Sequence, residues 1–170
     1  MAFQLKFDIG RLVLVVIASL GLMHALPASA QTQNETASVA VLPKAQLSIF
    51  STSNRQEKRA DFIVELARSP EHQRQGLMFR PTLANNAGML FIFNKPRQAR
   101  FWMRNTLIPL DMIFIKSNGE IETIVTRWDT QSDSHSLSTG NVRYVLEINA
   151  GFAQKLGIEA GHFIQLSALP

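Results

Sequence analysis

One segment sets the organisation of this chain: Arg100-Phe101-Trp102-Met103-Arg104-Asn105-Thr106-Leu107-Ile108-Pro109-Leu110-Asp111-Met112-Ile113-Phe114-Ile115. Polar side chains interrupt it between two apolar runs that are typical of buried strands. A buried polar group without a partner costs roughly 1–3 kcal/mol, so these side chains must bond to one another or to a ligand. Proline lacks the N–H that a sheet ladder needs. We therefore expect the chain to break at Pro109 and to turn before Asp111.

The segments that follow predict further strands. Residues 111–116 and 120–127 flank Ser117-Asn118-Gly119, which is the turn chemistry of a β-hairpin. After a predicted loop at residues 129–140, apolar and polar residues alternate over residues 142–148, as in a strand with one buried face. A short helix is then expected at residues 150–156, stopped by Gly157, and a last strand at residues 162–166.

The segments that lead up to it and into its first residues predict four strands and a helix. Short strands are expected at residues 47–51 and 60–68. Ser69-Pro70-Glu71 then has the cap, the proline and the acid of a helix start, and Gly76 is placed to end that helix. A buried strand at residues 88–93, a turn at residues 94–97 and a strand at residues 99–103 lead into the central segment.

Together these elements predict an α+β fold in a single compact domain. Strands outnumber helices, and several are joined by short antiparallel connections. We expect a mostly antiparallel sheet, curved or barrel-like, with two short helices packed on it.

The N-terminal segment has the layout of a secretory signal peptide. Lys6 and Arg11 precede an apolar run, and the small residues Ala28-Ser29-Ala30 close it. This predicts a signal peptide at residues 1–30, cleaved after Ala30, a flexible linker at residues 31–46, and the folded domain at residues 47–170. The protein is then exported to a periplasmic or extracellular location and meets the membrane only during export, unless the segment stays uncleaved as an anchor.

Composition excludes several kinds of chemistry. The sequence contains no cysteine, which excludes thiolate catalysis, disulfide exchange and thiolate metal sites. Its net charge of +4 is mild. Arg97, Arg100 and Arg104 lie close together, and such a cluster is either a footprint for phosphate or nucleic acid or a solvated face. Export argues against nucleic acid as a partner and leaves anionic glycans or lipid headgroups.

Three further motifs accompany the central segment: Arg74-Gln75-Gly76-Leu77-Met78-Phe79-Arg80, Gly88-Met89-Leu90-Phe91-Ile92-Phe93 and Tyr144-Val145-Leu146-Glu147-Ile148-Asn149-Ala150-Gly151. With these motifs the chain, from about Leu47 to Leu166, closely resembles the domain of unknown function 192 family. The resemblance implies a compact α+β domain, frequently exported or membrane-tethered in prokaryotes, with no established activity.

Asp111 and Glu147 are the best candidates for catalytic carboxylates. Each lies in or at the end of an apolar strand, where a charge is costly unless it is paired. Together with Arg80 or Arg104 they form either an acid and base pair in one pocket or a structural salt-bridge network. The sequence does not decide between the two.

Trp102, with Asn105 and Thr106 nearby, suggests a saccharide site. Aromatic faces stack on sugar rings, while amides and carboxylates bind the hydroxyl groups. The alternative is that Trp102 belongs to the core. The histidines and methionines match no metal-binding pattern, and no phosphate-binding loop occurs, so no metal or cofactor is predicted.

Three hypotheses follow for function. The first is an exported binding or accessory module, without catalysis, for a polar small molecule or saccharide of the cell envelope. The second is a glycan or cell-wall hydrolase that uses Asp111 and Glu147, and the third is a structural or interaction protein without a small ligand. The predicted pocket of the first hypothesis consists of Arg80, Trp102, Arg104, Asn105, Thr106, Asp111 and Glu147.

Overall fold

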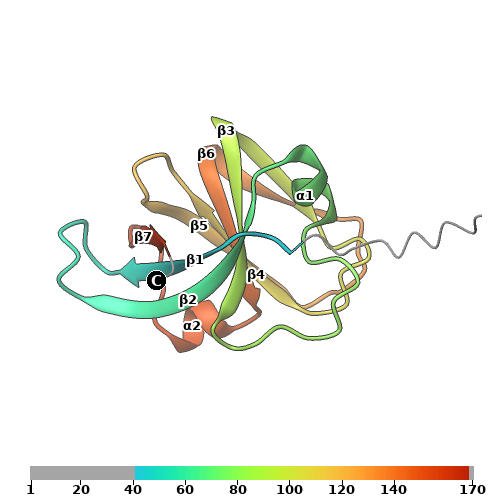
Figure 1. Cartoon of the computed structure of the whole chain (residues 1–170), viewed down its shortest axis with the longest axis horizontal. Coiled ribbons are helices and arrows are strands. Elements are labelled where there is room, and N and C mark those ends of the chain that lie inside the picture. The colour runs from blue at the N-terminus through green and yellow to red at the C-terminus, as the bar shows by residue number, and fades with distance from the viewer. Residues whose placement is uncertain (1–40, 169–170) are drawn as a thin grey trace, which may run out of the picture. The chain divides into compact units, whose positions relative to one another are not determined.

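The computed structural model describes residues 41–168, which form one sheet and two short helices (Figure 1). The elements are β1 (Lys44–Phe50), β2 (Lys58–Ala67), α1 (Pro70–Gln75), β3 (Ala87–Trp102), β4 (Leu110–Ile115), β5 (Ile121–Arg127), β6 (His135–Asn149), α2 (Phe152–Lys155) and β7 (Phe163–Ala168). The predicted signal peptide and most of the predicted linker lie outside the described residues. Neither α1 nor α2 has the length and apolar character that a membrane span requires.

The seven strands lie in the order β5-β4-β6-β3-β2-β1-β7. Strands β2 and β3 are parallel, and the other neighbouring pairs are antiparallel. A parallel pair needs a crossover connection, and α1 is part of it. The α+β class and the mostly antiparallel, curved sheet are thus confirmed. One isolated bridge, Glu120 to Phe163, joins strand β7 to the start of β5. The sheet itself is not closed, so the barrel-like alternative is not confirmed.

Both faces of the sheet are buried. Strand β4 is fully buried along its length, because its alternate residues enter two different hydrophobic clusters. Ile113 packs with the cluster on the face that α2 covers, and Met112 packs with the cluster on the face that α1 covers. Successive side chains of a strand point to opposite faces, so one residue of sequence decides which cluster a side chain joins.

Helix α1 forms where the sequence predicts it. The Ser69 hydroxyl accepts a hydrogen bond from the backbone N–H of His72 at 3.1 Å, Pro70 is the first helical residue, and Gly76 ends the helix with φ of +50°. The side-chain amide of Gln73 then fixes the helix to the sheet. It donates to the carbonyl oxygen of Ile92 on β3 at 2.8 Å. A six-residue helix is too short to be stable alone, so this bond and the packing beneath it hold α1 over β3.

The hairpin of β4 and β5 is also confirmed. Gly119 has φ of +87°, and its N–H donates to the Lys116 carbonyl at 3.0 Å. The Asn118 side chain accepts from the Glu120 N–H at 3.1 Å.

The predicted turn at residues 94–97 is wrong. Strand β3 continues through these residues as one element, and it pairs with β6 on both sides of residues 93–96. Its pairing register shifts between Ile92 and Arg97, and Pro96 lies within this irregularity. A proline disturbs a strand least where the ladder is already interrupted. Strand β6 likewise begins at His135, so the predicted loop at residues 129–140 is shorter than expected.

Candidate functional site

Glu147 lies in the middle of the sheet, on the face that α1 covers. Its register partners are Met89 on β3 and Met112 on β4, both fully buried. The Glu147 residue is only 4% exposed. Among the described residues, no side chain or backbone group donates a hydrogen bond to its carboxyl group. No buried side-chain oxygen of the described residues lacks a partner, so the oxygens of this carboxyl group must remain accessible from a cavity. A carboxyl group that is held inside the sheet with access to a cavity marks this position as a candidate site.

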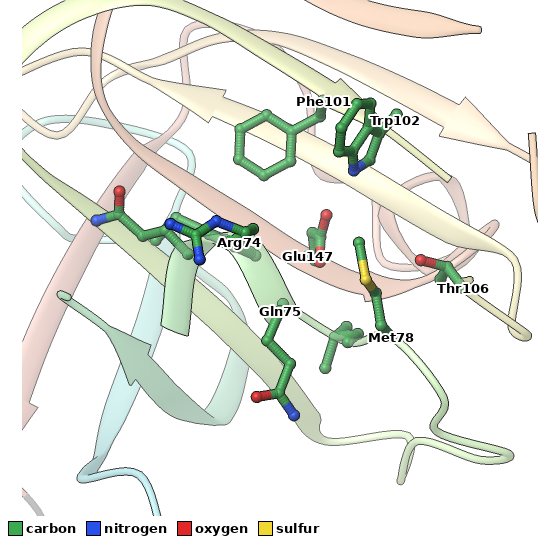
Figure 2. A pocket seen from close by; sticks show the side chains of 11 residues that line it. Arg74, Gln75, Met78, Phe101, Trp102, Thr106 and Glu147 are labelled. Atoms are coloured by element: carbon green, nitrogen blue, oxygen red, sulfur yellow. The ribbon is translucent and has the colours of Figure 1, made fainter. Parts of the chain in front are cut away.

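A cavity of about 30 Å³ opens above the Glu147 carboxyl group. Helix α1 and the residues after it form one wall, the end of β3 forms another, and Thr106 contributes from the loop before β4. Figure 2 shows Glu147 at the centre, with Phe101 and Trp102 on one side and Arg74 and Met78 on others. A water molecule needs about 10–15 Å³ of such volume, so the cavity holds one or two waters or a single functional group.

Burial raises the pKa of Glu147 to about 8. Removal from water disfavours the charged carboxylate, and no positive group lies close enough to compensate. At neutral pH the group therefore carries its proton. A neutral carboxyl group donates one hydrogen bond through its O–H and accepts through its other oxygen. The floor of the cavity can thus bind a hydroxyl, a carbonyl or an anionic oxygen.

Gly76 allows α1 to approach the sheet at this point. A Cβ atom at this position would lie 3.2 Å from the ring of Phe91. Its backbone also has φ of +50° and ψ of −135°, a conformation that glycine adopts most easily. Leu77, which follows, is buried in the same hydrophobic cluster as Met89 and Phe91. These contacts place Met78 beside the cavity.

Trp102 forms part of the wall and is also the outermost ring, 37% exposed. The guanidinium group of Arg104 lies over its ring, 4.3 Å from the centroid. Arg104 also pairs with Asp133 at 2.7 Å. Arg104 is therefore outside the cavity, where it covers and orients Trp102.

Asn105 and Thr106 belong to the loop before β4 and lie beside the residues that follow α1. Thr106 is buried and lines the cavity. The Asn105 carbonyl accepts from the Phe79 N–H at 2.8 Å, and the Asn105 amide lies 4.0 Å from the Met78 sulfur. Asn105 and Phe79 both have positive φ values, +55° and +63°. Two such residues joined by a hydrogen bond store backbone strain next to the cavity, as is common at binding sites.

Asp111 does not belong to this site, which corrects the sequence prediction. It pairs with Ile148, not Glu147, and its side chain points to the face that α2 covers. The carboxylate accepts hydrogen bonds from the Thr126 hydroxyl at 2.6 Å and from the backbone N–H groups of Gly151 at 3.1 Å and Ala153 at 2.8 Å. Asp111 thus fixes the start of α2. The hydrolase hypothesis needs two carboxylates at one cleft, and the sheet separates Asp111 from Glu147.

Arg80 is also engaged elsewhere. Its guanidinium group forms a two-bond pair with Glu65 on β2, at 2.7 and 2.6 Å. Glu65 pairs in register with Met89, and Met89 pairs with Glu147. Arg80 therefore lies on the correct face but one strand further from the cavity, and its charge is neutralised by Glu65.

The cavity continues into a wider groove between α1 and β3. A second hollow of about 140 Å³ shares Gln73, Arg74 and Trp102 with the cavity and adds Arg97 and Arg100. A third hollow of about 380 Å³ follows it. We call this run of three hollows the α1–β3 groove.

Sequence analysis missed the helix side of the site. Gln73, Arg74, Gln75 and Met78 line the cavity, as does Phe101, and none of them was predicted there. The motif at residues 74–80 contributes only Arg80 to the pocket that the sequence predicts. The parallel pairing of β2 with β3 brings this motif over Glu147. The residues near the motif do not predict that pairing, because it joins distant parts of the chain.

The described residues contain no group of three potential metal ligands. The loop between β5 and β6 contains two acids, and each is paired with an arginine. Asp133 pairs with Arg104, and Asp129 pairs with Arg127 at 2.6 Å.

Comparison with known proteins gives one family and two similar structures. The sequence profile of domain of unknown function 192, described as uncharacterized ACR, matches residues 51–166. A crystal structure from Sinorhizobium meliloti 1021, of a protein described as a proposed transcription regulator, is 38% identical with a TM-score of 0.68, over 74% of this chain and 95% of that one. A crystal structure from Novosphingobium aromaticivorans DSM 12444, of a protein of unknown function, is 37% identical with a TM-score of 0.70, over 75% of this chain and 89% of that one. No curated protein matches. The matched range contains every element that lines the cavity.

Proposed function

This chain belongs to the domain of unknown function 192 family, and we propose that it is a binding module for a polar small molecule or a saccharide of the cell envelope. The Glu147 cavity is the proposed site. One observation carries the proposal: Glu147 is 4% exposed, and its carboxyl group, without a hydrogen-bond partner among the described residues, reaches an open cavity beside an exposed aromatic ring.

The chemistry of the cavity suits an oxygen-rich ligand. The Glu147 carboxyl group offers one donor and one acceptor, and the buried Thr106 lies nearby. A ligand hydroxyl that bonds to Glu147 relieves a carboxyl group that otherwise has only water as a partner. A hydrogen bond of this kind contributes about 0.5–1.5 kcal/mol, and a mismatched apolar group would leave the carboxyl group unsatisfied.

Trp102 adds an apolar face to this polar floor. Arg104 and the pair that it forms with Asp133 hold the indole in place, so little side-chain freedom remains to be lost on binding. Alternating polar groups and aromatic faces are the usual means of binding a sugar ring.

The small volume of the cavity limits what enters it. About 30 Å³ accommodates a single functional group and not a whole ring. The remainder of the ligand must then lie in the α1–β3 groove outside it. This favours a ligand that extends beyond one small molecule, such as a glycan.

The proposed activity is binding of the ligand without its hydrolysis. Glu147 is the only carboxyl group among the residues that line the cavity, so the paired acid and base of a glycosidase has no counterpart there. Export of the chain, inferred from residues 1–30, is part of the same proposal and makes envelope glycans the available ligands.

The description of the Sinorhizobium protein as a proposed transcription regulator raises DNA as a second candidate ligand. Helices α1 and α2 have six and four residues, which is short for a recognition helix in a major groove. The basic groove still attracts phosphate, so an oligonucleotide belongs in the screen.

The test is a thermal-shift screen of the full chain against monosaccharides, glycan fragments and an oligonucleotide. A ligand present at about 100 times its Kd adds roughly 2.7 kcal/mol to the free energy of unfolding and raises Tm by several degrees. The shift should vanish in Trp102→Ala and Glu147→Leu and persist in Glu159→Gln, a carboxyl change at an exposed position. A ligand shift of equal size in all three variants would reject the Glu147 cavity as the site.

A further inference from the structure

Five positively charged side chains accompany the α1–β3 groove. Arg68, Arg74, Lys95, Arg97 and Arg100 are all exposed and line at least one of its three hollows. The only acid among the lining residues is Glu147, which burial keeps protonated at neutral pH. Such a groove concentrates anions from solution.

None of these five cations forms a salt bridge within residues 41–168. Four arginines outside the groove, Arg59, Arg80, Arg104 and Arg127, each have a salt bridge, whereas two others outside it, at positions 55 and 143, have none within that range. Two of the groove cations instead contact uncharged groups, an aromatic ring and a histidine nitrogen. The guanidinium group of Arg97 lies 4.1 Å from the centroid of the Phe93 ring, and one nitrogen of Arg100 lies 3.4 Å from Nδ1 of His135. Their hydrogen-bonding capacity remains largely free.

The arginines are arranged for more than one anionic group. Arg74 projects from α1 beside the cavity, whereas Arg97 and Arg100 project from the opposite wall. Arg97 and Arg100 are three residues apart on β3, which is about 10 Å in a regular strand. A shift of the pairing register between Gln98 and Arg100 lets both line the same hollow. A planar guanidinium group binds a carboxylate, phosphate or sulfate through two parallel hydrogen bonds. Groups at this spacing match repeated charges on a chain better than a single small anion.

We propose that the ligand is an acidic saccharide chain, of which one substituent enters the Glu147 cavity while carboxylate, phosphate or sulfate groups on neighbouring sugar units pair with Arg74, Arg97 and Arg100. This inference rests on the proposed function and gives its ligand class. The protonated Glu147 adds a donor to an anionic oxygen where a carboxylate would repel it.

Two features favour a glycan over a single-stranded nucleic acid. A nucleic-acid groove stacks successive bases on a series of exposed aromatic rings. Here Trp102 is the one exposed ring among the groove residues, so a series of rings for successive bases is not present among them. The recess at Glu147 is also too small for a base, whereas a sugar substituent enters it.

The experiment compares matched polymers by isothermal titration calorimetry on the full chain. Dextran and dextran sulfate share a backbone and differ in charge, polygalacturonate supplies carboxylates, and a single-stranded oligodeoxynucleotide supplies phosphates without the glycan. The variants are Arg97→Gln/Arg100→Gln for the groove and Trp102→Ala for the cavity wall. Arg59→Gln is the control for the loss of an arginine charge outside the groove.

We expect polygalacturonate or dextran sulfate to bind and dextran to bind weakly or not at all. The groove variant should lose at least tenfold in affinity, which is about 1.4 kcal/mol, because two guanidinium groups no longer donate charge-assisted hydrogen bonds. Trp102→Ala should also weaken binding, and Arg59→Gln should leave it unchanged.

Four results would overturn the proposal. If dextran binds as well as its sulfate and the groove variant changes nothing, the charge assignment is wrong while the binding function stands. If only the groove variant matters and Trp102→Ala does not, the polymer binds by charge alone and the cavity is not involved. If the oligonucleotide binds more tightly with the same dependence on Arg97 and Arg100, the ligand class is wrong. If no polymer binds, the proposed function fails with it.

Discussion

Glu147 and Asp111 lie on neighbouring antiparallel strands, one residue out of register, and their side chains point to opposite faces of the sheet. Asp111 pairs with Ile148, and Glu147 pairs with Met112. Both carboxyl groups are buried, yet their surroundings differ. Asp111 accepts three hydrogen bonds from the protein, whereas Glu147 accepts none from the described residues and opens into a cavity. The first carboxyl group stabilises the fold, and the second is available to a ligand.

Glu147 should make the protein less stable as pH rises. Its folded pKa of about 8 exceeds its ordinary value of 4.5, so between these values the native state holds one more proton than the unfolded chain. The free energy of unfolding then falls by about 1.4 kcal/mol per pH unit across that window. Glu147→Gln removes this dependence and should be more stable than the parent by roughly 3 kcal/mol at neutral pH.

Urea denaturation from acid to mildly alkaline pH measures this effect. The two proteins should converge in stability below the unfolded pKa, where Glu147 is protonated in both states. Glu159→Gln, at an exposed site, should follow the parent curve. Parallel curves for the parent and Glu147→Gln would show that Glu147 titrates normally.

Asp111→Ala should destabilise the fold strongly and leave ligand contacts intact. The substitution leaves three donors without their acceptor, including two backbone N–H groups at the start of α2. We expect a loss of roughly 3 kcal/mol or more in the free energy of unfolding. Thr126→Val is the milder comparison, since it removes one of the three hydrogen bonds and should cost about 1 kcal/mol. A ligand affinity that changes in Thr126→Val would contradict the separation of the two faces.

The pair of Arg80 and Glu65 should stabilise the protein above acid pH. The hydrogen bond from Arg80 lowers the pKa of Glu65, so its contribution is present above the unfolded value of 4.5 and is lost as pH falls through the lowered value. A double-mutant cycle with Arg80→Ala and Glu65→Gln should give a coupling of about 1 kcal/mol at neutral pH. The same cycle in acid should give a coupling near zero. A coupling that persists in acid would assign it to packing.

Gly76→Ala should cost more stability than Gly157→Ala. Both glycines have positive φ, +50° and +60°. An added Cβ at Gly76 meets the Phe91 ring at 3.2 Å, whereas at Gly157 nothing lies within 4 Å. Gly157→Ala therefore reports the backbone strain, about 1 kcal/mol. The excess in Gly76→Ala reports the close approach of α1 to β3, and it should be accompanied by weaker ligand binding. Equal losses in the two variants, measured by urea denaturation, would show that the approach is not tight.

Local features were predictable because their causes lie within a few residues of one another. The cap at Ser69, the glycine that ends α1, and the Asn-Gly turn between β4 and β5 all follow from neighbouring side chains and backbone. The turn predicted at residues 94–97 does not form, because contacts with a distant segment decide the conformation there. Pairing with β6 along the rest of the strand outweighs the local preference of Asn94 and Pro96 for a turn.

Part of the candidate site was predictable as well. Trp102, Thr106 and Glu147 line the cavity, and Asn105 contacts its wall through Met78. Arg80, Arg104 and Asp111 do not line it. Arg80 and Arg104 are paired with Glu65 and Asp133, which the sequence places far from them.

The sequence by itself determined the family, the α+β composition and the alternation that sets Glu147 apart from its neighbours Leu146 and Ile148. Only the tertiary structure decided that Asp111 shares a face with Ile148 and not with Glu147, and that α1 covers Glu147. The physical reason is that a shift of one residue in strand register moves a side chain to the other face of a sheet. Register is fixed by the packing of distant segments against one another, which no stretch of the chain encodes alone.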